Sequence, residues 1–340
     1  MLKKVKLENA IGLAIAHDMT KVVPGEYKGP RFRRGHVVTG EDLPELRLMG
    51  KEHIYVLENE EGLVHEEEAA LRIARAVAPA DARLSRPKEG RVNIVSPVFG
   101  LLKTKITLLD EINSMDNIVL AARHDNTACR PGEIIASTKI VPLLIEESVL
   151  AKVEKLCAKK GPVFHLLPFQ KKKVGIVITG GEVFKGLIKD RFGPILKKKV
   201  EAYGSSVYRQ IIVPDDEDII GDVIKDMAGQ GCELIFACGG LSVDPDDVTV
   251  EGIEKSGAGI ISYGAPVMPG AMFLYAVLGE IPILGAPGAV IAHRTTIIDI
   301  LLPRILAGIS ISKQDIVAMG NGGLCLECGS CLYQICPFGR

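Results

Sequence analysis

The second half of the chain repeats one pattern: an apolar run, a turn with small residues, and a stretch with helical periodicity. Val174 to Thr179 is a continuous apolar run, typical of a parallel strand that helices cover on both faces. Gly180-Gly181 follows it directly, and the spacing then predicts a helix from Leu187 to Tyr203. Strand, glycine turn and helix in repeated order indicate a doubly wound α/β domain. Further repeats begin at Ser206 to Val213, Glu233 to Cys238 and Pro282 to Leu284, the last leading into a long helix that ends near Ala307-Gly308.

The first half of the chain lacks this regular repeat. Gly90 to Val98 and Gly132 to Ile145 favour strands, whereas Glu66 to Ala78 and Glu146 to Lys159 have helical spacing. A polar break at Lys171-Lys172-Lys173 separates the two patterns. The predicted fold class is therefore α/β, with a three-layer C-terminal domain built on a mostly parallel sheet. We predict a mixed α+β domain over 1–168, an α/β domain over 169–312, and a hinge with a short Cys-rich metal-binding tail over 313–340.

Composition excludes several classes of partner. The chain has 340 residues, 47% of them hydrophobic and 24% charged, which is enough for two buried cores. Its net charge is -1 and it has no Trp, so we expect no nucleic-acid partner. The longest apolar runs fall well short of the roughly 20 residues that span a bilayer, and no secretory leader is visible at the start. We therefore expect a soluble, cytoplasmic protein with reduced cysteines.

Three turns with small residues follow the predicted strands. In an open parallel sheet, ligands bind outside the carboxyl ends of the strands, where helix N-termini present unpaired amides to anions. Glycine lets the backbone approach a phosphate closely, and Ser242 can add a hydroxyl donor. Each turn alone also has a purely structural explanation, since glycine satisfies turn geometry. Together they predict an anion site formed by Gly180-Gly181, Gly239-Gly240-Leu241-Ser242 and Gly285-Ala286-Pro287-Gly288.

Carboxylates cluster around the same turns. Mg²⁺ usually takes one or two carboxylates together with substrate phosphates and waters, so the cluster predicts Mg²⁺ beside the anion site. Asp215 and Asp247 also stand where helices are expected to begin, and N-capping is the alternative role for each. The acidic residues of the cluster are Glu182, Asp190, Asp215, Asp216, Asp244, Asp246 and Asp247.

Five segments of the second half, in one order, carry a family resemblance. They resemble the ordered motifs of the molybdopterin-binding domain, which is shared by molybdopterin adenylyltransferase and molybdopterin molybdotransferase. The whole chain looks most like a divergent group of molybdopterin-binding proteins from anaerobic bacteria. The five segments are 177–183, 213–216, 239–249, 267–270 and 285–288.

The resemblance implies a function in molybdenum cofactor biosynthesis. It implies that Asp215 and Asp247 are the catalytic acidic pair around Mg²⁺ and the reacting phosphate, and that the Gly239 turn holds the terminal phosphate of molybdopterin. In the adenylyltransferase reaction this phosphate attacks the α-phosphate of ATP; in the molybdotransferase reaction the adenylylated pterin is cleaved as molybdate is inserted. The relatives also imply a homo-oligomer. The predicted cofactor-binding residues are Gly180, Gly181, Glu182, Gly239, Gly240, Ser242, Asp244, Pro269, Gly270, Pro287 and Gly288.

Two positions depart from the family pattern. Asp244 stands where the motif GGxSxG has its third glycine, and Ala289-Val290 follows Pro287-Gly288 where the family often has PGNP. A carboxylate beside a phosphate repels it unless a metal intervenes, so Asp244 either strengthens a metal site or marks lost activity. Three functions remain open: a Mg²⁺-dependent transferase acting on the pterin, a non-catalytic carrier that delivers the cofactor to a client molybdoenzyme, and a nucleotide pyrophosphatase.

Four of the eight cysteines lie close together at the end of the sequence. Cys325, Cys328, Cys331 and Cys336 read C-x2-C-x2-C-x4-C, and Pro337 follows. This resembles the ferredoxin run but has no second set of ligands, so the spacing predicts one site, either a [4Fe–4S] cluster or a structural Zn²⁺. We expect metal to order this tail because it has no core of its own. The preceding 320–323 segment, Gly-Asn-Gly-Gly, is expected to be a flexible hinge.

Overall fold

The computed structural model describes residues 2–23, 25–57 and 62–339 and divides into two compact units. The last change from one unit to the other falls after residue 165, and the predicted domain boundaries at 168 and 312 stay predictions. Unit 1 comprises Met1–Pro97, Thr104–Arg123 and Pro131–His165, and unit 2 comprises Val98–Lys103, His124–Arg130 and Leu166–Arg340.

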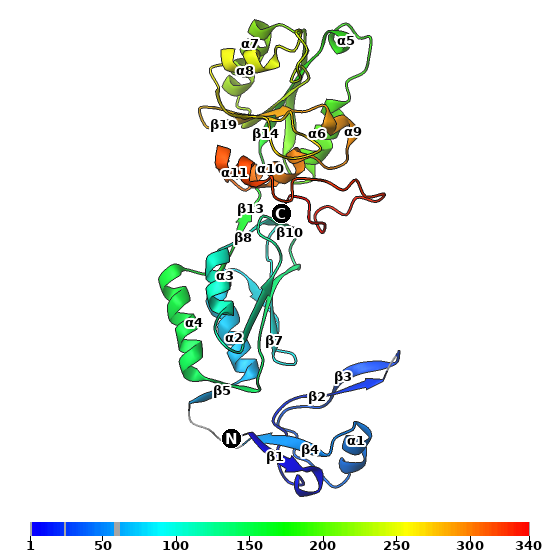
Figure 1. Ribbon diagram of the computed structural model, residues 1–340, viewed down its shortest axis with the longest axis vertical. Coiled ribbons are helices and arrows are strands. Elements are labelled where there is room, and N and C mark those ends of the chain that lie inside the picture. The colour runs from blue at the N-terminus through cyan, green and yellow to red at the C-terminus, as the bar shows by residue number, and fades with distance from the viewer. Residues whose placement is uncertain (1, 24, 58–61, 340) are drawn as a thin grey trace. The chain divides into compact units, whose positions relative to one another are not determined.

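Unit 1 contains a four-stranded sheet, β6-β7-β11-β9, against which α2 packs (Figure 1). The helix predicted at 66–78 is α2, Glu66–Val77, and it buries Ala70, Ile73, Ala74 and Val77 on one face, as the spacing requires. The second predicted helix is α4, Glu147–Lys160, which lies along α2. The remaining elements of this part are β5 (Leu63–His65), β6 (Arg83–Leu84), β7 (Arg91–Val95), α3 (Ile106–Asn113), β9 (Ile118–Ala122), β11 (Ile134–Ile140) and β12 (Leu144–Glu146).

The first 57 residues form smaller pieces around a separate apolar cluster. This cluster includes Leu7, Ile15, Phe32, Leu46 and Ile54, all buried. Two antiparallel pairs, β1 with β4 and β2 with β3, surround it. The elements are β1 (Leu2–Lys6), a 3-10 turn (Leu7–Asn9), β2 (Met19–Val23), β3 (Tyr27–Phe32), α1 (Leu43–Leu48) and β4 (His53–Leu57).

Unit 2 is built on a six-stranded sheet in the order β15-β14-β16-β19-β18-β17. The first four strands are parallel, and β18 and β17 continue the sheet antiparallel, so the predicted mostly parallel sheet is confirmed with an antiparallel edge. β13 (Phe164–Pro168), β8 (Gly100–Thr104) and β10 (Ala128–Cys129) form a small further sheet. The main strands are β14 (Lys173–Thr179), β15 (Ser206–Val213), β16 (Leu234–Cys238), β17 (Gly259–Tyr263), β18 (Leu274–Leu278) and β19 (Ile281–Ala286).

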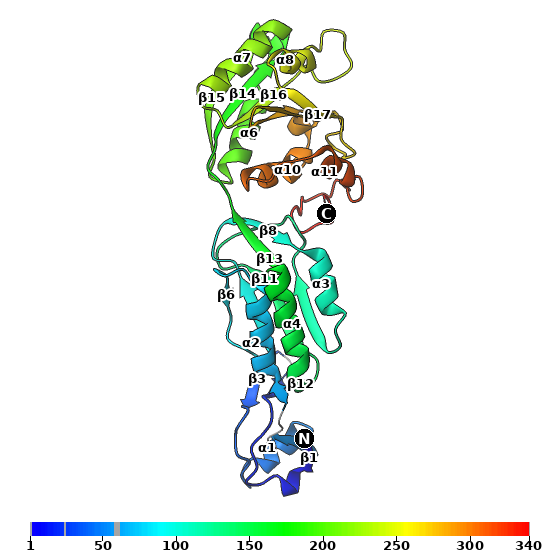
Figure 2. The ribbon, with the colours of Figure 1, turned by 90° about the vertical axis from the view of Figure 1, so that its left-hand side faces the viewer.

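Helices cover both faces of this sheet, giving three layers (Figure 2). Alternate residues of β14 point to opposite faces: Ile176 packs with α6 and α10, whereas Val177 packs with α7 and α8. Every residue of β14 after Lys173 is buried, which explains why its sequence is a continuous apolar run. The helices are α5 (Gly181–Phe184), α6 (Phe192–Glu201), α7 (Glu217–Gly229), α8 (Thr249–Lys255), α9 (Ala289–Ala292), α10 (Ile297–Leu306) and α11 (Lys313–Ala318).

Two predicted helices were wrong in extent. The helix expected from Leu187 begins only at Phe192, because the Asp190 carboxylate accepts the backbone N–H groups of Phe192 and Gly193 at 2.7 and 3.1 Å. The long helix expected after Gly288 is two helices, α9 and α10. Thr296 starts α10 afresh through a capping box with Asp299.

Candidate functional site

The predicted turns lie together at one edge of the unit 2 sheet. Gly180 follows β14, Asp215 follows β15, Gly239 follows β16 and Pro287 follows β19. These four strands are parallel neighbours, so their carboxyl ends share one edge. The sheet therefore brings together the turns that the sequence predicted as an anion site, as expected for an open α/β sheet.

The turn after β14 has space around it, and one of its backbone amides donates a hydrogen bond to a carboxylate. Gly180 has φ +135°, a conformation that favours glycine, and a Cβ added there would have no neighbour closer than 3.8 Å. The Gly181 N–H donates to Asp215 Oδ2 at 2.6 Å. Asp215 does not cap α7; that role belongs to Asp216, which accepts two backbone N–H groups at 3.0 Å. The capping alternative for Asp215 was therefore wrong.

Asp247 stabilises its own loop through hydrogen bonds to backbone amides. Its Oδ2 accepts the backbone N–H of Ser242 at 2.9 Å and that of Asp244 at 3.3 Å. The N-cap position of α8 is Val248, which makes no side-chain cap bond, so capping by Asp247 was also wrong. Tyr263 also stabilises this loop, because its hydroxyl donates a hydrogen bond to Leu241 O at 3.0 Å.

The second glycine pair, Gly239-Gly240, is packed closely. A Cβ added to Gly239 would lie 2.5 Å from Thr179 O, and one added to Gly240 would lie 2.5 Å from Thr249 Oγ1. The two threonines are buried, and their hydroxyl oxygens are 3.0 Å apart. Neither threonine was predicted to contribute to the site, although Thr179 directly precedes the first glycine pair. Close packing and the positive φ angles of Gly239 (+91°) and Gly240 (+56°) both favour glycine in this turn.

The remaining predicted residues lie in two other turns, in the short helix α5 and in the exposed loop after β16. Gly270 has φ +123° and a Cβ added there would lie 2.9 Å from Ile297 Cγ2, so the Pro269-Gly270 turn contacts the start of α10. Gly288 precedes α9 and has open space where a Cβ would be. Glu182 and Asp244 have exposed side chains. The glycine turns are therefore edged by carboxylates, which oppose a phosphate unless a cation is present.

The cysteine tail packs on the body of unit 2 (Figure 1, red). Phe338 is 4% exposed and belongs to the core cluster that contains α10, and Cys325 and Cys336 pack against the same cluster. Gly323 is also fixed, since a Cβ there would lie 2.3 Å from Pro266 O. The expectations of a free hinge and of a tail without a core were therefore wrong, because the tail uses the core of the α/β domain.

No preformed metal site is present in residues 2–23, 25–57 and 62–339, since no three His, Cys, Asp or Glu side chains converge there. The four tail cysteines form no disulfide. Cys331 differs from the other three in its environment: the Thr295 hydroxyl, 3.1 Å from Sγ, lowers the pKa of its thiol, and the Tyr333 backbone N–H adds to the effect. The structure thus gives no support for a bound metal beyond the spacing of the cysteines.

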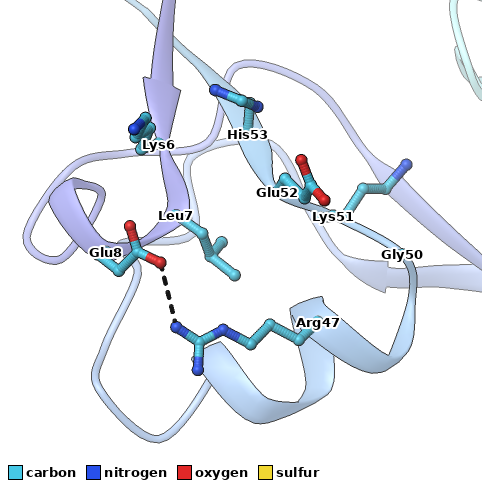
Figure 3. Close-up of a pocket in the computed structure, with 8 residues that line it drawn as sticks. All are labelled: Lys6, Leu7, Glu8, Arg47, Gly50, Lys51, Glu52 and His53. Atoms are coloured by element: carbon cyan, nitrogen blue, oxygen red, sulfur yellow. Dashed lines mark hydrogen bonds and ion pairs between the residues drawn. The ribbon is translucent and has the colours of Figure 1, made fainter.

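A cavity of about 510 Å³ lies in unit 1, and none of its lining residues is a predicted site residue (Figure 3). Its charges are mixed, and Arg47 is paired with Glu8 at 3.3 Å, both side chains being more than half exposed. An open, mostly neutralised surface of this kind specifies no ligand. The lining residues are Lys6, Leu7, Glu8, Arg47, Gly50, Lys51, Glu52 and His53.

Within the described ranges, none of the helices combines the length and the hydrophobicity that crossing a bilayer requires.

Comparisons with known sequences match two stretches of the chain to families. Residues 175–307 match the family described as "probable molybdopterin binding domain", and residues 4–58 match a family described as a domain of unknown function. A molybdopterin molybdenumtransferase from Synechococcus elongatus is 25% identical over 176 residues, which is 49% of this chain and 44% of the relative. A CinA-like protein from Mycobacterium tuberculosis is 37% identical over 83 residues, 24% of this chain and 19% of the relative. The chain thus spans less than half the length of these curated relatives.

Solved structures of similar proteins each cover about two fifths of the chain. The Mog protein of molybdopterin biosynthesis from Mycobacterium ulcerans is 22% identical, covering 41% of this chain and 99% of its own, with a TM-score of 0.35. The molybdopterin biosynthesis enzyme MoaB from Thermus thermophilus is 20% identical, covering 40% and 97%, with a TM-score of 0.32. The family match agrees with the order of motifs along unit 2. Over residues 175–307, this chain belongs to the molybdopterin-binding domain family of molybdenum cofactor biosynthesis.

Proposed function

We propose that this protein binds molybdopterin at the glycine turns of unit 2 and acts on its phosphate with Mg²⁺ in cytoplasmic molybdenum cofactor biosynthesis. The observation that carries the proposal is the pairing of each predicted catalytic carboxylate with a turn amide. Asp215 accepts from Gly181, and Asp247 accepts from Ser242. These bonds hold both carboxylates at the edge of the sheet where the terminal phosphate would bind, so a cation held by them could also contact that phosphate.

The carboxylates also suit a divalent cation. In the described part of the chain, the second oxygen of each, Oδ1, accepts no hydrogen bond, so it is available to a metal while Oδ2 holds the loop. Mg²⁺ needs only one or two carboxylates when a phosphate and waters complete its shell. Bound there, Mg²⁺ would neutralise charge on the phosphate and offset its repulsion from Asp215, Asp244 and Asp247.

Two reactions fit this arrangement. In adenylyl transfer, a phosphate oxygen of the pterin attacks the α-phosphorus of ATP, a new P–O bond forms, and the bond to the leaving pyrophosphate breaks. In molybdate insertion, the adenylylated pterin is cleaved. In both, the role we assign to the glycine-turn amides and Ser242 is to orient the phosphate, and the role of Asp215 and Asp247 is to hold the cation. The cysteine tail is part of the proposal as a [4Fe–4S] or Zn²⁺ site, on the basis of its spacing.

One observation favours a non-catalytic carrier as the second candidate. The Ser242 amide is already taken by Asp247, and the adjacent glycine pair is closed by Thr179 and Thr249. If this loop keeps its conformation when ligand is present, the pterin phosphate would meet only the turn after β14. The protein would then hold the finished cofactor for a client molybdoenzyme without turning it over.

One assay separates these functions. Purified protein is incubated with molybdopterin, ATP and Mg²⁺, and adenylylated pterin is followed; a second arm supplies adenylylated pterin with molybdate. The enzyme predicts product in one arm and a loss of at least about 100-fold in rate for Asp247→Asn, with binding kept within about threefold. Asp222→Asn, an exposed carboxylate on α7, is the matched control and should retain full rate.

The other outcomes are equally informative. Binding of molybdopterin without turnover in either arm supports the carrier. ATP cleavage that needs no pterin indicates a nucleotide pyrophosphatase. Failure to bind molybdopterin with or without Mg²⁺ contradicts the proposal as a whole. A chelator should weaken binding by about tenfold or more in the native protein, and by less in Asp247→Asn, because one repelling charge has been removed.

A further inference from the structure

One buried side chain, His65, links the first 57 residues to the rest of unit 1. The ring is 6% exposed, and its Nε2 lies 2.9 Å from Ala16 O. The Ala16 N–H donates to Tyr55 O at 2.9 Å, so this carbonyl is fixed within the N-terminal part. His65 belongs to the other side of the junction, where it ends β5 and pairs with Leu144 of β12. The junction therefore contains a buried hydrogen bond between residues 49 positions apart.

Other features of the junction make this bond important. The apolar cluster described above for the N-terminal part consists of residues 5–56 alone. Two further polar contacts cross the junction at partly or fully exposed side chains: Thr20 Oγ1 donates to Glu89 Oε1 at 2.9 Å, and Arg34 lies 3.7 Å from Glu67. Exposed contacts of this kind contribute little to stability. We therefore expect the buried ring of His65 to be the strongest of these three polar links.

His65 also caps α2. Its Nδ1 accepts the Glu67 N–H at 3.3 Å and so satisfies one of the amides that the start of a helix leaves unpaired. The helix packs on β7 and β11 of the four-stranded sheet. One ring thus caps α2 with one nitrogen and contacts Ala16 with the other.

These two bonds fix the protonation state of the ring. A carbonyl oxygen only accepts, so Nε2 must carry a proton to bond Ala16 O, and an amide only donates, so Nδ1 must carry none to bond Glu67. Only the neutral ring satisfies both partners. A proton added to Nδ1 would point at the Glu67 N–H and remove the cap. It would also place a positive charge at the N-terminus of α2, where the helix dipole opposes it.

A second histidine lies at the same junction. His17 directly follows Ala16, and its Nδ1 is buried with no hydrogen-bond partner in the part of the chain that the structure describes. Burial is the largest influence on both rings, and it lowers the pKa of His65 and that of His17 below the ordinary value of 6.5. His65 itself further lowers the pKa of His17. The closed junction is therefore an environment that excludes protons from both rings.

Charged groups around the two rings act in both directions. The carboxylates favour protonation, but each has another partner: Glu66 lies 3.5 Å from Lys139, Glu67 lies 3.7 Å from Arg34, and Asp18 accepts the Arg34 N–H at 2.8 Å. Burial and the cations outweigh them, since both pKa values are lowered. The groups that oppose protonation are Arg34 at His65 and Lys51 at His17; those that favour it are Glu66 at both rings, Glu67 at His65 and Asp18 at His17.

We propose that protonation of His65 opens this junction and releases the first 57 residues, still folded around their own apolar cluster, from the start of α2. The closed ring has the lower pKa, so below pH 6.5 the open form binds a proton that the closed form excludes. The closed junction is consequently favoured above pH 6.5 and weakens as the pH falls below this value. The first part of the chain would then respond to acid independently of unit 2.

The test begins with the ring state of the native full-length chain. Nitrogen chemical shifts of ¹⁵N-labelled histidine distinguish the two neutral forms of the ring from the charged form. At about pH 7.5 we expect His65 to carry its proton on Nε2 and none on Nδ1. A ring that is charged or protonated on Nδ1 at this pH overturns the proposal.

Hydrogen exchange then measures the opening. The protection factor of the Glu67 N–H, taken relative to the unstructured chain at the same pH, should fall about fivefold to tenfold between about pH 7.5 and 5.5. Hydroxyl-radical labelling of the His17 ring should rise over the same range, because release exposes the junction. Constant protection at Glu67 overturns the proposal. A loss of protection without increased labelling of His17 overturns the release, since the cap alone would then have opened.

His65→Asn separates the cap from the titration. The Asn side chain offers an N-cap oxygen but does not titrate, so the protection of Glu67 should change by less than about twofold over this pH range. Labelling of His17 should already be high at neutral pH, because the Nε2 bond to Ala16 is gone. A pH dependence in this variant equal to that of the native protein overturns the assignment to His65. If the variant does not fold, the ring state and the exchange of the native chain still decide the question.

His165→Asn is the matched control. His165 lies in β13, and burial together with Lys105 lowers its pKa, so it is a second shielded histidine outside the junction. This variant should keep the native fall in Glu67 protection within about twofold. Loss of the pH dependence in His165→Asn would assign the effect to another part of unit 1 and overturn the proposal.

Discussion

Two glycine pairs follow neighbouring strands of the same sheet, yet they serve different ends. Gly180-Gly181, after β14, has space around it and donates an amide to Asp215. Gly239-Gly240, after β16, is pressed against Thr179 and Thr249. The same dipeptide is thus an open anion-facing turn in one place and a packing requirement in the other. If a phosphate binds at this edge as proposed, the β14 turn offers space that the β16 turn lacks.

The largest expected effect is the difference in stability cost when one methyl group is added to each turn by a Gly→Ala substitution. Gly239→Ala puts a Cβ 2.5 Å from a backbone oxygen at φ +91°, so it should destabilise unit 2 by roughly 3 kcal/mol. Gly181→Ala meets only Asp215 Oδ2 at 3.5 Å and should change stability by about 0.5 kcal/mol or less. Native-state hydrogen exchange of β14 and β16 measures both values. Equal losses of stability in Gly239→Ala and Gly181→Ala would contradict the difference in packing between the two turns.

A smaller effect is expected from the hydroxyl pair that closes the β16 turn. Thr249→Val leaves the buried Thr179 hydroxyl without this partner and should cost roughly 1–2 kcal/mol. Thr179→Val with Thr249→Val removes both hydroxyls and should cost less than the sum of the single changes. Thr20→Val, at an exposed hydroxyl in unit 1, is the control and should stay within about 0.5 kcal/mol. Strict additivity of the two buried changes would show that the pair does not act as a unit.

The smallest effect concerns Tyr263, which ties the β16 loop through Leu241 O. Tyr263→Phe should cost below about 1 kcal/mol, because the ring is 44% exposed. Burial, with added repulsion from Asp247 and Glu251, raises the pKa of Tyr263 above 10. The unfolded chain therefore releases this proton first, and the stabilisation is present below pH 10 and is lost as the pH rises through the folded pKa. The protection of the β16 loop against amide hydrogen exchange should fall between pH 9 and 11 in the native protein. A similar fall in Tyr263→Phe would show that another group causes this pH dependence.

Much of unit 2 could be predicted from sequence because its central strands β14, β16 and β19 are buried along almost their whole length. The apolar run at 174–179 is β14, the predicted strand 206–213 is β15, and the turns that follow them lie at one edge of the sheet. The helix boundaries were less predictable. Asp190 and Thr296 start helices with side-chain bonds to nearby amides, and the periodicity of apolar residues does not register such bonds.

The location of the candidate site could be predicted from the sequence, but its hydrogen bonds and packing contacts could not. The family motifs placed Asp215 and Asp247 beside the glycine turns, and the structure agrees. Their expected capping roles were wrong, since each accepts amides of a turn instead. Phe338 packs into the core of unit 2 and so attaches the tail to that core. No pattern in the sequence around Phe338 predicts this contact.

The sequence alone determined the order of strands and turns, the family of residues 175–307 and the spacing of the four cysteines, because these depend on local patterns along the chain. Tertiary structure decided which glycine turn is open and where the cysteine tail attaches. Thr179 meets Thr249 across 70 residues, and Thr295 meets Cys331 across 36. Contacts over such separations arise only once the sheet has brought distant segments together, so neither hydropathy nor motif order can reveal them.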